Sequence, residues 1–127
     1  MGTAEDEDLQ ALQGSWRQVA FEQDGVDDPP DTHGAPDSLT EIRGNRYTVT
    51  TVEGDVILEG SFVLDAGVTP HRITWTDDEG PRGHTSLTAS YRIEGDRFAF
   101  IGSLDGPVPT EFKTGRGEQM RSFVRAR

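Results

Sequence analysis

The sequence predicts an all-β fold, an antiparallel up-and-down β-barrel of eight to ten strands with one short N-terminal helix. In Ser86–Phe100, apolar and polar residues alternate with period two around a turn at Glu94-Gly95-Asp96, as expected for a β-hairpin. Other strand-length segments are separated by turns drawn from 15 glycines and 7 prolines. The chain leaves no room for crossover helices, so antiparallel pairing is expected, and a sheet this long tends to close on itself.

The first element is a helix over about residues 5–12. Thr3 can cap free backbone amides, the acidic residues after it suit the positive end of the helix dipole, and Gly14 favours its end. Strands are then expected at about residues 14–23, 39–43, 47–53, 56–64, 71–76 and 119–125, in addition to the hairpin of residues 86–100. Gly60 is expected to mark a bulge or a bend, as barrel closure often requires.

Asp24–Asp37 differs in composition from the rest of the chain. It has five aspartates and three prolines, which predicts an exposed, mobile loop near one barrel opening. The acidic residues do not follow the D-x-D-x-D-G spacing of a calcium loop.

Length and composition indicate one domain over residues 1–127 with a formal net charge of −11. This charge disfavours nucleic acid and anionic membranes as partners, although solubility alone also explains it. The sequence has no cysteine, no apolar N-terminal run and no segment of transmembrane length, which favours a cytoplasmic monomer or homodimer.

The triplet Gly14-Ser15-Trp16, after a short helix and at the start of the first strand, resembles the lipocalin and wider calycin signature. In that superfamily the tryptophan plugs the barrel base and a basic residue of the last strand packs across it. The resemblance implies Arg125 as this partner, with Arg121 or Arg127 as alternatives after a register shift.

A closer resemblance is to an uncharacterised family of bacterial lipocalin-like domains. It rests on residues 12–16 (L-Q-G-S-W), 69–70 (T-P), 79–83 (E-G-P-R-G), 91–96 (Y-R-I-E-G-D) and 109–112 (P-T-E-F). The chain departs from the family at Val108, where an arginine is usual, and in the acidic loop. The family implies a fold but no agreed activity.

Alternation places a set of mostly apolar side chains inside the barrel. They are Trp16, Gln18, Ala20, Tyr47, Val49, Thr51, Leu58, Phe62, Ile73, Trp75, Leu87, Ala89, Tyr91, Phe98 and Phe100. Of these, the residues expected to bind a ligand are Gln18, Tyr47, Leu58, Phe62, Trp75, Tyr91 and Phe100. Such walls fit a pocket for a small apolar or amphiphilic molecule that enters opposite Trp16, and the alternative is a filled core.

No segment carries a strong catalytic or metal-binding motif. His33, His71 and His84 lie on separate segments without the close pair common in zinc sites, so no metal and no cofactor is expected. The G-x-S-x-G motif of serine hydrolases is absent. Tyr91, Tyr47 and His71 are the candidate catalytic residues, and His71 is either an inward general base or an exposed strand-end residue.

Three functions therefore remain open. The first is a barrel that binds a small, largely apolar molecule. The second is a cofactor-independent cyclase or isomerase in the same cavity, acting on a polyketide-like or terpenoid-like substrate in natural-product biosynthesis. The third is an acidic protein-interaction domain with a filled barrel.

Overall fold

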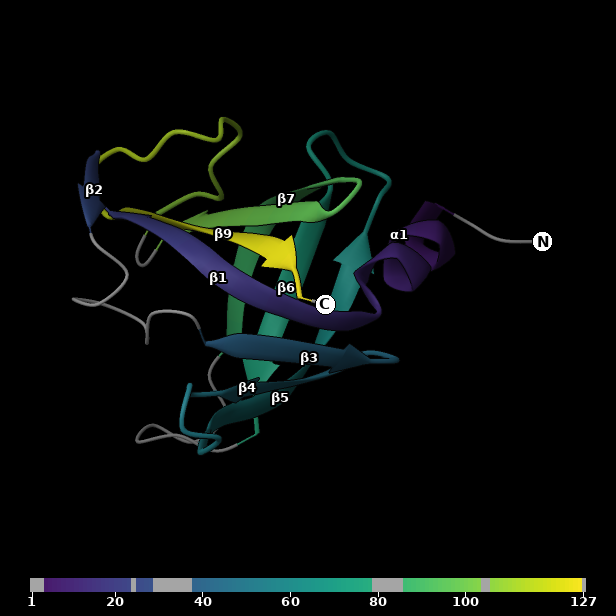
Figure 1. The fold of residues 1–127 in the computed structure, drawn as a ribbon. Helices are drawn as coiled ribbons and strands as arrows, with labels where there is room; N and C mark the ends of the chain where they lie inside the picture. Colours follow the sequence, from purple (N-terminus) through teal and green to yellow (C-terminus); the bar gives the residue numbers. More distant parts are fainter. Residues whose placement is uncertain (1–3, 24, 29–37, 79–85, 104–105, 127) are drawn as a thin grey trace.

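The structure, a computed structural model, describes residues 4–23, 25–28, 38–78, 86–103 and 106–126. Within these residues the chain forms one helix and nine strands (Figure 1). The elements are α1 (Ala4–Leu12), β1 (Gly14–Gln23), β2 (Val26–Asp28), β3 (Leu39–Arg43), β4 (Arg46–Thr50), β5 (Val56–Asp65), β6 (Arg72–Asp77), β7 (Ser86–Glu94), β8 (Arg97–Ser103) and β9 (Glu118–Arg125).

The strands form a closed antiparallel barrel. The order in the sheet is β2-β1-β3-β4-β5-β6-β7-β8-β9, and β1 also pairs with β9. This last pairing closes the sheet into an up-and-down barrel made of β1 and the strands from β3 to β9. The short strand β2 pairs with the end of β1 outside this ring. In Figure 1, α1 lies at one end of the barrel and β2 at the other. The predicted fold class is therefore confirmed.

Helix α1 covers one end of the barrel. Leu12 is fully buried and belongs to the same core cluster as Trp16. The Gln13 side chain bonds the backbone of Gly44 in the β3–β4 turn, with its amide nitrogen 2.9 Å from the Gly44 carbonyl oxygen. We call this the helix end of the barrel, and the opposite end, where β1 finishes and β9 begins, the mouth.

A β-bulge in β1 corrects the predicted inner face. The register against β9 shifts between Gln18 and Ala20, so that the strand gains a residue and its alternation reverses. Ala20 was expected inside but is exposed, and Phe21 was expected outside but is buried. The outer face of β1 is not covered at Val19, which is 42% exposed.

Gly60 has a role other than the predicted bulge. The register shift between β4 and β5 falls between the pairs Val49–Leu58 and Thr50–Val56, away from Gly60. A Cβ at Gly60 would lie only 2.7 Å from Cζ of Tyr47, the residue paired with it on β4. Glycine is required here because the tyrosine ring lies across the strand.

Part of the segment between β8 and β9 packs on the outer face of β7. Ser90, buried on the outer face of β7, donates its hydroxyl to the Pro109 carbonyl oxygen at 2.5 Å. The Arg92 guanidinium lies 4.7 Å from the ring centroid of Phe112. The 109–112 motif therefore covers part of the barrel wall.

Two other predicted segments differ from the structure. The strand expected over residues 47–53 ends at Thr50. Residues 26–28 of the expected loop Asp24–Asp37 form β2, and the remainder of that loop, apart from Gly25, lies outside the described residues. The described part of the chain contains no helix long and apolar enough to cross a membrane.

Candidate functional site

Apolar side chains on the inner face become more exposed towards the mouth. On β5, Phe62 is 2% exposed, whereas Leu58, four residues nearer the mouth on the same face, is 36% exposed. Val49, paired with Leu58, and Leu87 on β7 are partly buried. The barrel thus has a packed interior next to the helix and an accessible apolar rim at the mouth.

Aromatic rings fill the middle of the barrel around Trp75. Its ring centroid lies 5.1 Å from that of Tyr47, 5.4 Å from that of Phe62 and 5.1 Å from that of Phe100. Tilted and edge-on pairs at these separations are favourable arrangements of aromatic quadrupoles. The predicted inward residues Tyr47, Phe62, Trp75 and Phe100 therefore lie together.

The indole N–H of Trp75 is a buried donor that has no acceptor in the part of the chain that the structure describes. Trp75 is 9% exposed, and among the described residues no acceptor receives a hydrogen bond from its Nε1 atom. A buried donor left unbonded costs about 1–3 kcal/mol. An acceptor atom entering this part of the barrel would remove that cost.

A second donor group on the inner face is the guanidinium of Arg121 on β9. Its Nη1 atom donates to Oε1 of the buried Gln18 at 2.9 Å, and its Cζ atom lies 4.4 Å from the ring centroid of Phe21. Desolvation lowers the pKa of Arg121 below its usual range. A cation–π contact returns about 0.5–2 kcal/mol, less than the several kcal/mol needed to desolvate a charged group.

The Tyr47 hydroxyl is already bonded. It donates to the carboxylate of Asp77, the last residue of β6. Burial, and then this hydrogen bond, raises the pKa of Tyr47 well above its usual value. Asp77 is partly buried and fixes the tyrosine, while its neighbour Asp78 forms an ion pair with Arg46.

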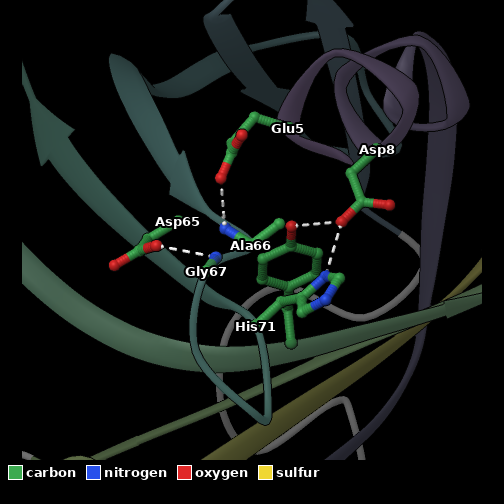
Figure 2. Close-up of polar contacts among 7 residues, drawn as sticks. Glu5, Asp8, Asp65, Ala66, Gly67 and His71 are labelled. Carbon is green, nitrogen blue, oxygen red and sulfur yellow. Dashed lines mark hydrogen bonds and ion pairs between the residues drawn. The ribbon is translucent and has the colours of Figure 1, made fainter. Parts of the chain in front are cut away.

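The Tyr91 hydroxyl is bonded to the helix. It donates to Asp8 Oδ2 at 2.5 Å, and His71 Nδ1 lies 2.8 Å from the same oxygen (Figure 2). Burial, and then the bond to Asp8, raises the pKa of Tyr91. Figure 2 also shows Glu5 next to Ala66, whose amide donates to Glu5 Oε2 at 2.8 Å. These contacts hold α1 against β7 and the β5–β6 loop, to which His71 and Ala66 belong.

The helix end carries the predicted tryptophan–arginine pair. Trp16 is fully buried, and the Arg125 Cζ atom lies 4.3 Å from its ring centroid. Arg125 also donates to the carbonyl oxygens of Ala11 at 2.7 Å and Gln13 at 2.8 Å, while Trp16 Nε1 donates to the Leu12 carbonyl oxygen at 2.8 Å. Arg125 thus lies over the Trp16 ring, whereas Arg121 lies over the Phe21 ring, and Arg127 is outside the described residues.

The structure distributes the predicted ligand-binding residues between two environments. The barrel interior contains the side chains of Gln18, Phe62, Trp75 and Phe100, and the rim of the mouth contains that of Leu58. Tyr47 and Tyr91 are inward, but their hydroxyls already donate to carboxylates. Of the three histidines only His71 is described, and its half-buried side chain faces Asp8 at the helix end rather than the mouth.

Sequence reasoning missed two residues that now matter. Asp8 was assigned only to the acidic first turn of the helix, because its contacts with His71 and Tyr91 cannot be read from local sequence. Arg121 was considered only as a partner of Trp16. Its spacing of two from Phe123, which is buried inside the barrel, was a signal for an inward side chain.

A separate hollow of about 100 Å³ lies on the outside of the barrel, over β1 and β7 to β9. Outward side chains such as Arg92, Ser122 and Val124 line it, beside the bulge at Val19.

Closed antiparallel strands, a single helix at one end and a buried aromatic interior define a lipocalin-like β-barrel. Comparison of the chain with models of protein families, with curated proteins and with solved structures finds no match.

Proposed function

We propose that the barrel binds a small, largely apolar molecule on its inner face, through the mouth. The observation that carries this proposal is the unbonded indole N–H of Trp75, set among aromatic rings behind an accessible apolar rim. Apolar walls with a few placed polar groups are typical of small-molecule sites. The ligand would therefore present an acceptor atom to Trp75 and apolar surface to Leu58 and Phe100.

Membership of the bacterial lipocalin-like family is part of the same proposal. The packing of Arg125 on Trp16, and the positive φ of 113° at Gly14, support it. A side chain at Gly14 would meet Arg125 Nη1 at 3.2 Å, so the glycine leaves space for the guanidinium. The pair closes the helix end and leaves the mouth as the route for the ligand.

Titration with the neutral dye N-phenylnaphthylamine tests the proposal. Its fluorescence should rise saturably, with quenching of the tryptophans that marks binding near Trp75. Leu58→Arg should weaken binding at least about tenfold, because it places a charge on the apolar rim. The matched control is Val63→Arg on the outer face of the same strand, where Val63 is 65% exposed.

Binding to Val63→Arg should equal that of the original protein. Absence of saturable binding, or equal losses in the Leu58 and Val63 variants, would refute an interior site and favour the filled-barrel interaction domain.

A further inference from the structure

Among the described residues, the guanidinium of Arg121 has no anionic partner. The ion pairs among the described residues do not include it, and desolvation alone accounts for the direction of its pKa shift. Arginine has five N–H donors. Within the described part of the chain the only hydrogen bond from this side chain goes to Gln18, a neutral acceptor. Most of its N–H donors therefore have no acceptor among the described residues.

The N–H donors of Arg121 lie inside the proposed binding region. Arg121 pairs with Phe100 across β8 and β9, and Phe100 in turn contacts the Trp75 ring. Phe100 thus has the Trp75 ring against its own ring and Arg121 as its neighbour on the adjacent strand. Arg121 is in the mouth half of β9 and is only partly buried, so a molecule entering from the mouth can reach it.

We propose that Arg121, oriented by Gln18 and Phe21, receives the acid group of the ligand, and that the ligand is a small apolar molecule with a single carboxylate. This inference rests on the proposed binding function and specifies its ligand class. A carboxylate would supply the charge that Arg121 lacks and would accept two parallel hydrogen bonds from the guanidinium.

The net charge of the whole chain restricts the expected class of ligand further. With a formal net charge of −11, the protein repels polyanions such as nucleic acids. A single negative charge on an apolar body meets less repulsion, and inside the barrel it interacts with Arg121 without the full screening of water. Monocarboxylates are therefore favoured over phosphorylated or polyacidic molecules.

Displacement of N-phenylnaphthylamine provides the test, with naphthoate and its neutral amide, naphthamide, as competitors of equal shape. Naphthoate should bind at least about tenfold more tightly than naphthamide. Arg121→Met, which keeps the length of the side chain, should abolish this preference, so that the two competitors displace the dye equally well. The matched control, Arg17→Met on the exposed outer face of β1, makes the same change of net charge and should keep the preference.

The outcomes separate the two proposals. If the dye does not bind, the binding function fails. If the dye binds and both competitors are equal, or if Arg121→Met retains the preference, only the carboxylate site is refuted. Should Arg121→Met not fold, the guanidinium ¹⁵N resonances of Arg121 in the original protein decide: naphthoate should shift them and naphthamide should not, and an equal response overturns the inference.

Discussion

Replacing Gly60 with alanine is expected to destabilise the barrel strongly, because two neighbours occupy the space of the new methyl group. A Cβ would lie 2.2 Å from the Thr76 carbonyl oxygen and 2.5 Å from the Tyr47 hydroxyl oxygen. The first is a backbone atom of β6, which is held in register against β5. The second can move only if Tyr47 leaves its hydrogen bond to Asp77.

The magnitude follows from three contributions. Inserting a methyl group into a packed site costs about 1–3 kcal/mol, and losing a hydrogen bond to a charged group costs about 1.5–3 kcal/mol. Alanine offsets about 0.4–1 kcal/mol by restricting the unfolded chain, since Gly60 has no positive φ in the folded state. The free energy of unfolding should fall by about 2–5 kcal/mol.

Chemical denaturation followed by tryptophan fluorescence measures this change. The control is Gly115→Ala, whose Cβ would meet only Glu118 Oε1, at 3.4 Å, and which should alter stability by less than about 0.5 kcal/mol. Tyr47→Leu should relieve one of the two contacts, so the double variant with Gly60→Ala should lose less stability than the sum of the single changes. Strict additivity, or a Gly60→Ala variant as stable as the control, would refute this account of the tyrosine.

Three further changes test individual contacts, made by Arg125, Asp8 and Glu22. Arg125→Met should reduce the free energy of unfolding by about 2–4 kcal/mol, because it removes the contact with Trp16 and two hydrogen bonds to carbonyl groups; Arg125→Lys should recover only part of this in the same denaturation assay. Asp8→Ala should cost about 1–3 kcal/mol and speed amide exchange in the helix, since a buried hydroxyl loses its acceptor; unchanged exchange would contradict this. Hydrogen bonds from Thr114 lower the pKa of Glu22 below its ordinary value of 4.5, so their stabilising effect is present above that pH and is lost as the pH falls through the lower, folded-state pKa. The exchange protection of the Thr114 amide should therefore fall in acid, and Glu22→Gln should remove this dependence.

The elements that sequence predicted well are those encoded by neighbouring residues. The hairpin of β7 and β8 follows from uninterrupted alternation and a glycine turn, and its strands lie where the pattern places them. Trp16 and Arg125 were predicted through a short motif and the end of the last strand. By contrast, the contact of Asp8 with Tyr91 joins residues 83 positions apart, and no local pattern specifies it.

The inner polar groups were harder to predict because they break the pattern from which the barrel was inferred. The bulge after Gln18 reverses the faces of β1, and it brings Phe21 inside, next to Arg121. On β9, Arg121 and Arg125 occupy inward positions where alternation alone expects apolar residues. Arg125 has several partners for its guanidinium, since it donates to two carbonyl oxygens and packs on the ring of Trp16. Among the described residues, Arg121 has one neutral hydrogen-bond partner and the ring of Phe21 but no carboxylate. A ligand carboxylate is the group that we propose supplies the opposite charge.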